Sequence, residues 1–479
     1  MYKINYSFLL PFYNLYIIFN MTNISEIAKK LSERITNAET RQRSRTAEEY
    51  QRFLYAIEYI LTDIWKSSYI HPEAECSIHK HNNYYSSNTR YSDPNLTYRM
   101  TMNAFDGLQL LNLIVVTKDG YYDRTKMQGG LTRYRAREEL LEMLNEIPEH
   151  PAIHLKPNLD AETILLRNEI DGRKVLVDYE EDAFTEKARN NLKTINQCFT
   201  RHWVDLRILD KDVLALQERL FDDTEKQPID LTKRTLVRIF TNNSFEEGGR
   251  FYRGWWQNVP SEYRPYITID SKATSEHDYS QLNPNMIYSV YNKELGSEDA
   301  YSRVAGEEHR DVVKKAFNAM FQHSRVLNTK PDDIDKIDLD TIGMSWIELK
   351  EAILNAHKPI KDYFFRGLGN RLQFEDSCIA ESVMLQFAKM DAPALPIHDS
   401  FIMHQGFGTY GELEEAMRRA FYERFNKDIG VSRDLVVQHK SNIPIDKDGF
   451  VSLEIDDILN AENEYSQWRY RDDMWISRK

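Results

Sequence analysis

Two aspartates lie at the ends of strand-like segments that are far apart along the chain. Asp278 ends the second of the two strands that ITIDSKATSEHDYS predicts, and an apolar helix pattern follows it. Asp399 lies at the tip of the β-hairpin that ALPIHDSFIM predicts. Two acids on neighbouring strand ends would offer Mg²⁺ the hard oxygen ligands that it prefers. Two such ions about 4 Å apart can activate a hydroxyl group and stabilise a leaving pyrophosphate in an in-line displacement.

A basic helix is predicted between these two acids, over residues 307–321. Its Arg310 and Lys314 are spaced i and i+4, so they lie on one face of the helix. Displacement at a triphosphate needs positive charge of this kind around the phosphates. The order acid, basic helix, acid is therefore the order expected for nucleotidyl transfer.

Each of these residues also has a simpler interpretation. Asp278 can cap the helix that follows it, and Asp399 can be an ordinary turn aspartate. Arg310 and Lys314 can form a solvated helix face, as charged pairs at this spacing usually do. The catalytic interpretation depends on all four residues meeting in space.

The composition is that of a folded globular protein. The chain has 479 residues, enough for two or three domains, with 41% hydrophobic and 12% aromatic residues. Its net charge of −13 argues against indiscriminate binding to polyanions, but it leaves room for a local basic cleft.

The cysteines indicate a reducing compartment. Cys76, Cys198 and Cys378 are odd in number and far apart, which does not suit a disulfide framework. We therefore expect a cytoplasmic protein. Cys76, His79 and His81 resemble a zinc site only superficially, because no fourth ligand with suitable spacing is present.

The first twenty residues form an apolar, aromatic leader. Pro11 and Asn14 interrupt it, Lys3 is its only charge, and no small-residue cleavage site follows. MTNISEIAKKL then opens a capped amphipathic helix, so we expect Met21 to be the functional start and residues 1–20 to lie outside the fold. No other segment is long and apolar enough to span a bilayer, and no membrane partner is predicted.

Residues 21–150 are predicted to form a domain that contacts nucleic acid. Helix patterns are followed by VVTKDGYYDR, which predicts a strand, an Asp-Gly turn and a second strand. A helix followed by a small hairpin is the arrangement of a winged helix, in which basic side chains contact phosphates. The alternative is an ordinary α+β module with a solvated charged surface. The basic residues of this region are Arg99, Lys118, Arg124, Lys126, Arg133, Arg135 and Arg137.

Four segments in a fixed order resemble the polymerase core of the family A DNA polymerases and their relatives, the phage-type single-subunit RNA polymerases. The resemblance covers about residues 245–425. DYSQLNPNMIY, HRDVVKKAF and IHDSFIM resemble motifs A, B and C of that family, and GGRFYRGWWQNVP resembles the segment that precedes motif A in DNA polymerase I-like enzymes. Four motifs in the right order, each on its expected element, rarely arise by chance.

The resemblance implies a metal site and a nucleotide site. Asp278, the backbone carbonyl of Tyr279 and Asp399 would hold two Mg²⁺ or Mn²⁺ ions. Arg310 and Lys314 would grip the triphosphate of the incoming nucleotide.

The resemblance also implies contacts with a primer–template. His398 would lie near the primer terminus, and Arg250 and Gln257 would touch the duplex. We also expect Arg371 and Gln373, just before an apolar helix, to reach the primer or template strand.

The chain departs from the family pattern at positions that select the base and the sugar. Motif B lacks the usual Tyr-Gly pair, so Phe317 and Phe321 are the candidates for stacking on the incoming base. Asn283 stands where the DNA enzymes usually carry a glutamate that blocks a ribose 2′-hydroxyl, and Ser400 is typical of the RNA enzymes. The Gln-Asn-Val-Pro segment favours the DNA enzymes, so the sugar preference stays open. The short interval between motifs A and C implies reduced fingers.

Together these features predict an α/β (α+β) fold, with a right-hand polymerase palm of antiparallel strands, short helical fingers and the winged-helix-like region. We expect residues 151–235 to form a connector or thumb-like helical region, and residues 236–479 to form the palm and fingers. The predicted function is template-directed nucleotidyl transfer on a DNA primer–template with nucleoside triphosphates, with DNA synthesis favoured over RNA synthesis. A short polymerase with its own DNA-binding module suits a plasmid, phage or other mobile element.

Two other functions stay open. A catalytically silent, polymerase-like DNA-binding initiator or regulator would explain the missing Tyr-Gly pair. A metal nuclease that uses the same acids would cleave nucleic acid without nucleotides.

Overall fold

The computed structural model describes residues 16–17, 22–40, 43–86, 89–123, 128–223, 226–408, 411–434 and 467–478. Nearly all of the predicted apolar leader therefore lies outside the described residues. Its described part is β1 (Tyr16–Ile17), which pairs with β7 (Lys156–Pro157). Among the described residues, no helix combines the length and the apolar character that crossing a membrane requires.

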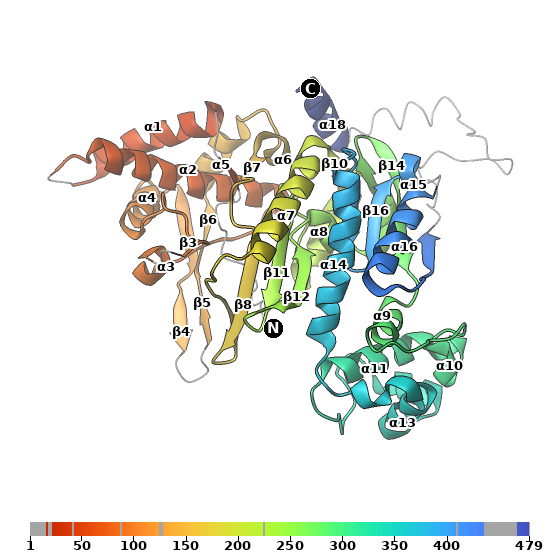
Figure 1. The fold of residues 1–479 in the computed structure, drawn as a ribbon. Coiled ribbons are helices and arrows are strands. Elements are labelled where there is room, and N and C mark those ends of the chain that lie inside the picture. The colour runs from red at the N-terminus through yellow and green to blue at the C-terminus, as the bar shows by residue number, and fades with distance from the viewer. Residues whose placement is uncertain are drawn as a thin grey trace.

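Helices and a small sheet form the amino-terminal part of the molecule (Figure 1). Its elements are α1 (Thr22–Ala38), α2 (Ala47–Ile70), β2 (Cys76–Ile78), α3 (Asn82–Ser86), α4 (Tyr98–Leu110), β3 (Ile114–Lys118), β6 (Thr132–Ala136), α5 (Glu138–Asn145) and α6 (Pro151–His154). A capping box begins α2, because Thr46 and Glu49 each accept a hydrogen bond from the other's backbone N–H. Apolar residues at helical spacing, among them Leu31, Ile57 and Phe105, are fully buried and form one core with the sheet.

A long hairpin replaces the predicted Asp-Gly turn. β3 pairs with β6, and β4 (Tyr121–Asp123) pairs with β5 (Gln128–Gly130) in a continuing register. Asp119 and Gly120 therefore lie along the hairpin and not at its tip, so the predicted turn is wrong. The Gly120 N–H donates across the hairpin to Thr132 Oγ1 at 3.0 Å, which keeps the two arms together at this point. The predicted order of a helix followed by a hairpin is present, and the sheet has the order β2-β6-β3.

Two sheets cross the predicted boundary between residues 235 and 236. Their elements on either side are β8 (Ile164–Ile170), β9 (Arg173–Leu176), α7 (Ala183–Arg201), β10 (Val204–Leu206), α8 (Asp210–Asp222), β11 (Val237–Thr241), β12 (Ser244–Tyr252) and β13 (Ile267–Ile269). One sheet has the order β12-β11-β8-β9, with β8 parallel to β11, and a second ladder joins β10 to β13. The segment predicted as a connector is thus built into the sheets of the region that follows it.

An antiparallel sheet forms the centre of the carboxy-terminal part. Its remaining strands are β14 (Lys272–Tyr279), β15 (Leu395–Ile397), β16 (Ser400–His404) and β17 (Val431–Asp434). The order is β10-β13-β14-β16-β15, and β17 also pairs with β14, which gives a curled sheet. Two helices, α14 (Gly369–Ala388) and α16 (Glu412–Phe425), pack against each other, and α14 also packs along β12 and α7 (Figure 1). The chain is therefore a mixed α+β protein.

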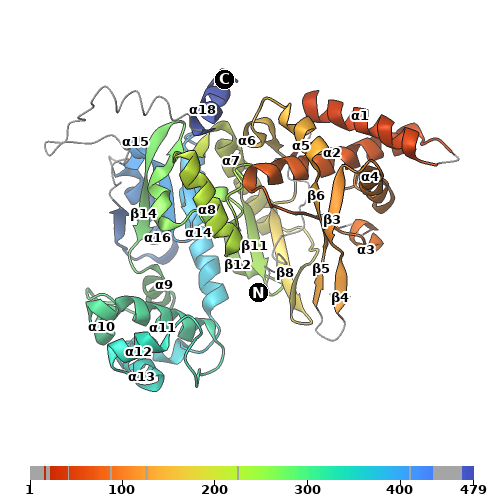
Figure 2. The same cartoon turned by 180° about the vertical axis from the view of Figure 1, so that it is seen from behind.

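A group of short helices projects below this sheet in Figures 1 and 2 and is called the helical subdomain here. It comprises α9 (Leu282–Val290), α10 (Ser302–Ala305), η3 (Glu307–His309), α11 (Arg310–Gln322), α12 (Lys336–Ile342), α13 (Trp346–Ala356) and η4 (Lys358–Tyr363). Its own apolar core includes Val313 and Met320 of α11 and Leu349 and Ile353 of α13, all fully buried. The chain enters the helical subdomain directly after β14 and leaves it into α14. The subdomain is therefore connected directly to the strand that carries Asp278.

The last described helix, α18 (Gln467–Ser477), docks against β10. Arg471 reaches Asp205 through three hydrogen bonds of 2.7–3.2 Å, and both side chains are buried. Trp475 stacks on Trp203, with ring centroids 5.4 Å apart. Segments from near the two ends of the described chain therefore meet around β10 and α6.

Gly249 is expected to tolerate no side chain. It lies in β12 with φ +77°, and a Cβ there would come within 2.8 Å of Phe240 Cε1 and 2.9 Å of Ser377 Oγ. We expect Gly249→Ala to lower the free energy of unfolding by about 3 kcal/mol, from left-handed strain and overpacking together. The matched control is Gly172→Ala, which has φ +73° but no atom within 4 Å, and should lose only about 1 kcal/mol. Urea unfolding followed by circular dichroism measures both, and equal losses would contradict the packing argument.

Candidate active site

The two predicted acids lie at the same end of the central sheet. Asp278 is paired with Ser400 in the β14–β16 ladder, and Asp399 is the residue immediately before that strand. Residues 398 and 399 form the two-residue turn between β15 and β16, and His398 has the left-handed φ of +55° that such a turn requires. The predicted strand end and hairpin tip are thus confirmed. Both carboxylates line one cavity of about 320 Å³.

The environment of Asp278 disfavours its charge. Its Oδ1 is buried and has no hydrogen-bond partner among the described residues. Burial raises the pKa of Asp278 from its ordinary 3.8 to about 7, the charge of Asp399 adds to the rise, and Lys314 opposes it. An unsatisfied carboxylate oxygen is costly to bury, and a bound cation would remove that cost. These oxygen donors therefore fit a hard divalent ion such as Mg²⁺ or Mn²⁺.

The free energy of unfolding of the metal-free protein should fall as pH rises from 3.8, the pKa of Asp278 in the unfolded chain, to about 7, its pKa in the folded protein. Folded Asp278 keeps its proton up to about pH 7, whereas the unfolded chain releases it near 3.8, so the folded state binds more protons between these values. Asp278→Asn removes the buried charge. We expect the variant to be more stable than the parent by about 2 kcal/mol at about pH 8, and to show no gain at about pH 4. Urea unfolding in a chelator at both pH values measures this, and a gain independent of pH would contradict it.

The predicted cations lie opposite the acids in the same cavity. Arg310 and Lys314 both line it, from the first turns of α11. Two residues that the sequence did not indicate also contribute. Asp299 forms an ion pair with Arg310, with 3.1 Å between Asp299 Oδ2 and Arg310 Nη2. The Arg310 guanidinium also lies over the Tyr301 ring, 5.2 Å from its centroid. Asp299 and Tyr301 both lie just before α10 and outside the four sequence motifs, so no sequence pattern indicated them.

The two phenylalanines proposed to stack on a base are buried instead. Phe317 is 0% exposed and Phe321 is 2% exposed, and neither lines the cavity. Both pack against Phe364, at centroid distances of 5.4 and 4.1 Å. They continue the helical stripe of Arg310 and Lys314, but further along α11 that stripe enters the core of the helical subdomain. The prediction of a base-stacking role is therefore wrong for both, and the aromatic residues that line the cavity are Tyr279 and Tyr301.

Tyr279 and Asn283 also line the cavity. The Tyr279 side chain points away toward α16, where its hydroxyl donates to the Met417 carbonyl at 2.7 Å. Asn283 donates to Asn318 Oδ1 at 3.0 Å and so ties α9 to α11. Asn283 is thus held at the junction between the sheet and the helical subdomain.

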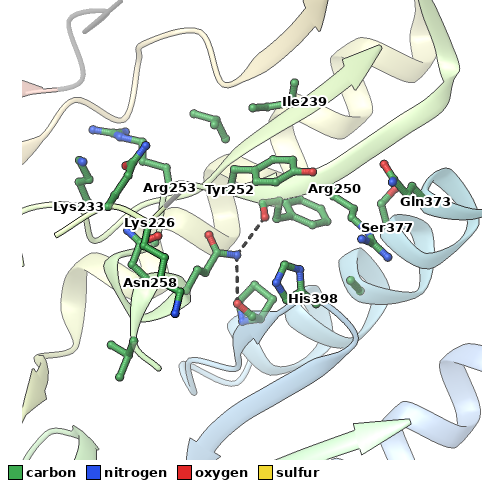
Figure 3. Close-up of a pocket in the computed structure, with 18 of the residues that line it drawn as sticks. Lys226, Lys233, Ile239, Arg250, Tyr252, Arg253, Asn258, Gln373, Ser377 and His398 are labelled. Atoms are coloured by element: carbon green, nitrogen blue, oxygen red, sulfur yellow. Dashed lines mark hydrogen bonds between the residues drawn. The ribbon is translucent and has the colours of Figure 1, made fainter. Parts of the chain in front are cut away.

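A second, larger cavity opens on the other side of the β15–β16 hairpin (Figure 3). It measures about 1040 Å³ and is lined by β11, β12, the residues of η1 (Trp255–Asn258) and η2 (Ser261–Tyr266), and one side of α14. We call it the basic groove, because its lining residues include eight cations against four acids, Glu162, Asp223, Glu262 and Asp376. The cations are Arg167, Lys174, Arg219, Lys226, Lys233, Arg250, Arg253 and Arg264.

The basic groove gathers four of the five residues that were predicted to contact the primer–template. Arg250, Gln257, Gln373 and His398 all line it. Arg371 does not line it, and instead pairs with Glu246 at 2.7 Å and with Glu375 at 3.3 Å. The turn residue His398 therefore belongs to the basic groove, and its neighbour Asp399 belongs to the cavity of about 320 Å³ that it shares with Asp278, called the acidic cavity here. The two residues of this turn therefore line different cavities, and the turn lies between them.

Polar contacts hold this hairpin tip in place. Gln257 Nε2 donates to the carbonyls of Phe251 and Pro396, at 3.0 and 3.2 Å. Arg250 donates to Asp376 on α14 at 2.7 Å. Burial raises the pKa of Asp376 to about 6, Arg250 opposes the rise and the charge of Asp399 adds to it. Asp376 is a third carboxyl near the site that the sequence motifs did not indicate.

Three of the five amino-terminal basic residues that the structure describes are paired with acids. Arg99 lies 3.2 Å from Glu49, and Arg133 lies 3.4 Å from Glu75. Arg135 reaches Glu75 at 3.5 Å. Arg124 and Lys126 lie outside the described residues.

No protein-family model matches the chain, and a search of the curated proteins finds no match.

Proposed function

We propose that this chain is a template-directed nucleotidyltransferase that uses two Mg²⁺ or Mn²⁺ ions. The observation that carries the proposal is the single cavity that Asp278, Asp399, Arg310 and Lys314 share. Two acids opposite two cations are the arrangement that transfer from a triphosphate needs. A solvated helix face or an isolated helix cap would not bring all four together.

In this proposal the central antiparallel sheet is the palm and the helical subdomain is a short set of fingers. Asp278 and Asp399 hold the metal ions, which would activate a hydroxyl and stabilise the leaving pyrophosphate. Arg310 and Lys314 bind the triphosphate from the opposite wall. Tyr301 is only 1% exposed, so it would support the Arg310 guanidinium that lies over its ring.

The basic groove is proposed to bind the primer–template. Its cations suit a phosphate backbone, and its own local charge differs in sign from the acidic total of the chain. Arg250 and Gln257 would contact the duplex where it approaches the hairpin. His398 would then lie beside the primer terminus, one residue from the metal-binding Asp399.

The amino-terminal helices and long hairpin are proposed to be a winged-helix-like DNA-binding module. Helix α4 directly before the hairpin supports this proposal. Because Arg99, Arg133 and Arg135 are already paired with acids, phosphate contacts would fall to the other cations of this region. We place this polymerase in the cytoplasm, serving a plasmid, phage or other mobile element.

The proposed sugar preference depends on the Gln-Asn-Val-Pro segment, because Asn283 by itself does not exclude a ribose. Asn283 is uncharged and held by Asn318, so it offers a ribose 2′-hydroxyl less obstruction than a glutamate would. Ser400 Oγ donates to Glu276 Oε1 at 2.5 Å and so supports the ladder. The Gln-Asn-Val-Pro segment holds the hairpin through Gln257 and resembles a segment of the DNA enzymes, and we therefore propose DNA synthesis.

One observation favours a second function, a catalytically silent DNA-binding initiator or regulator. The Arg310 guanidinium is already engaged by Asp299, and both motif B phenylalanines are buried. An incoming nucleotide would have to compete with Asp299 for Arg310.

Primer extension decides between these functions. The full chain is incubated with a primed DNA template, Mg²⁺ or Mn²⁺, and separate pools of deoxynucleotides and ribonucleotides. Extension with the deoxynucleotide pool is the expected result, and extension with the ribonucleotide pool alone would reverse the sugar assignment. No extension together with tight, site-specific DNA binding would favour the initiator. Cleavage in the absence of nucleotides would favour a metal nuclease.

Asp299→Asn is expected to tighten nucleotide binding. Asp299 Oδ1 accepts from the backbone N–H groups of Tyr301 and Ser302, and asparagine can keep these bonds while losing the charge that holds Arg310. We expect the Kd of a nucleoside triphosphate with Mg²⁺ to fall about fivefold, or about 1 kcal/mol. Titration calorimetry measures this without any need for turnover. The control is Asp311→Asn, an exposed residue of α11, which should change little. Weaker binding in the Asp299 variant would contradict the proposed role of Arg310.

A further inference from the structure

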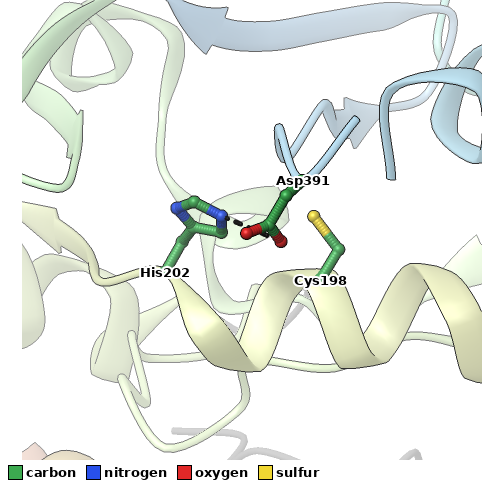
Figure 4. A group of neighbouring side chains, drawn as sticks. All are labelled: Cys198, His202 and Asp391. Atoms are coloured by element: carbon green, nitrogen blue, oxygen red, sulfur yellow. Dashed lines mark ion pairs between the residues drawn. The ribbon is translucent and has the colours of Figure 1, made fainter. Parts of the chain in front are cut away.

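A cysteine, a histidine and an aspartate meet at the carboxy-terminal end of α7. Cys198 and His202 are spaced i and i+4, so they lie on one side of the helix end, and Asp391 comes from the turn after α14 (Figure 4). One ligand atom from each residue, a sulfur, a ring nitrogen and a carboxylate oxygen, lie within 4.8 Å of one another. None of the three lines the acidic cavity or the basic groove.

A second carboxylate fixes the histidine ring. Asp270, in the turn between β13 and β14, lies 2.5 Å from His202 Nδ1 and also accepts from the Trp203 N–H at 3.0 Å. With Nδ1 engaged, Nε2 is left to face Asp391, 3.5 Å from its Oδ1. That Nε2 is buried and makes no hydrogen bond within the described part of the chain. A histidine whose far nitrogen is held by a carboxylate is the usual form of a metal-binding imidazole.

The spacing and the donor atoms suit Zn²⁺. Bonds of about 2.0–2.3 Å in a tetrahedral zinc site separate neighbouring ligand atoms by about 3.3–3.6 Å. The distance from His202 Nε2 to Asp391 Oδ1 already has this value, and the Cys198 sulfur lies within 4.8 Å of a ligand atom of each of these residues. Sulfur and nitrogen donors favour zinc over Mg²⁺, which takes oxygen ligands.

The surroundings attract positive charge, although one cation already competes. Two carboxylates flank the His202 ring, with Asp270 against Nδ1 and Asp391 facing Nε2. Arg201 contacts Asp391 Oδ1 at 2.6 Å and would have to share that carboxylate with a metal. The Asp391 side chain is 56% exposed, so ions and solvent can reach the cluster from this side.

We propose that Cys198, His202 and Asp391 bind one Zn²⁺ ion, with Asp270 as the positioning residue and solvent at the fourth position. The ion would join the end of α7 to the turn between α14 and β15, and so stabilise the packing of these two segments. This proposal does not depend on the proposed nucleotidyl transfer, because the two sites share no residue.

The test is Co²⁺ and Zn²⁺ binding by the full chain. The wild-type protein, stripped of metal and titrated with Co²⁺, should give one equivalent of a thiolate-to-cobalt charge-transfer band. Oxygen ligands at Asp278 and Asp399 cannot produce that band, so the two metal sites are distinguishable. Zn²⁺ should then displace the cobalt and abolish the band.

Variants locate the site. Cys198→Ser should remove the charge-transfer band and one equivalent of bound zinc by elemental analysis, while Cys378→Ser, the matched control, should keep both. Asp391→Ala changes an exposed side chain and should keep the fold while weakening zinc binding at least tenfold. A wild-type protein without the cobalt band, or a Cys198→Ser variant that retains it, would overturn the proposal. The cluster would then be an ion-pair network of His202 with Asp270 and Asp391.

Discussion

Replacing Asp399 by asparagine is expected to reduce primer extension at least about 1000-fold, because a lost metal ligand removes several kcal/mol of transition-state stabilisation. Asparagine has nearly the same size and stays neutral, so the turn between β15 and β16 should keep its shape. The loss should therefore appear in turnover, and binding of the primer–template by the basic groove should change little. Single-turnover extension with saturating DNA measures the first, and fluorescence anisotropy of labelled DNA measures the second.

The matched control is Asp428→Asn, an exposed aspartate that lines neither cavity. It should retain nearly full activity. Activity within tenfold of wild type in the Asp399 variant would remove the metal-ligand assignment. A loss of DNA binding equal to the loss of extension would instead indicate that the hairpin itself had been disturbed.

Replacing Arg471 by alanine is expected to lower the free energy of unfolding by about 3–5 kcal/mol. Asp205 is 0% exposed, and Arg471 supplies the only cation within ion-pair distance among the described residues. Without it the carboxylate keeps the Trp203 indole as a side-chain donor, at 3.1 Å, but its charge stays buried without compensation. Urea unfolding followed by tryptophan fluorescence measures the loss.

Two comparisons test the cause of this loss. Arg469→Ala removes an exposed arginine from the same helix and should change stability by less than about 0.5 kcal/mol. Adding Asp205→Asn to Arg471→Ala should recover part of the loss, because the uncompensated charge is then gone. Equal losses for Arg469→Ala and Arg471→Ala would show that docking of α18, and not the buried charge, sets the effect.

The sequence predicted the local elements around the two acids well. The strand-like patterns in the segments that end at Asp278 and flank Asp399 correctly indicated strands. The i and i+4 spacing correctly placed Arg310 and Lys314 on one face of a helix. These patterns are local and have a fixed period, so they can be read without knowledge of the fold.

The failures have long-range causes. An Asp-Gly pair usually indicates a tight turn, but here Gly120 is held by Thr132 across a longer hairpin. Helical spacing could not reveal that Phe364 covers Phe317 and Phe321, because η4 comes later in the chain. Asp376 and Cys198 gave no signal for a related reason, since their partners Arg250 and Asp391 are distant in sequence. The parallel pairing of β8 with β11 across residue 235 likewise joins segments that are distant in sequence, so neither segment alone indicated it.

The two acids are neighbours through one strand ladder, whereas the chain between them is routed through the helical subdomain. Insertions or deletions within the loops of that subdomain would leave the pairing of Asp278 with Ser400 untouched. The subdomain can therefore shrink or grow over evolutionary time, or be exchanged by an engineer, without resetting the distance between the carboxylates. A single residue added inside β16 would have the opposite outcome, since it would turn every following side chain to the other face of the sheet.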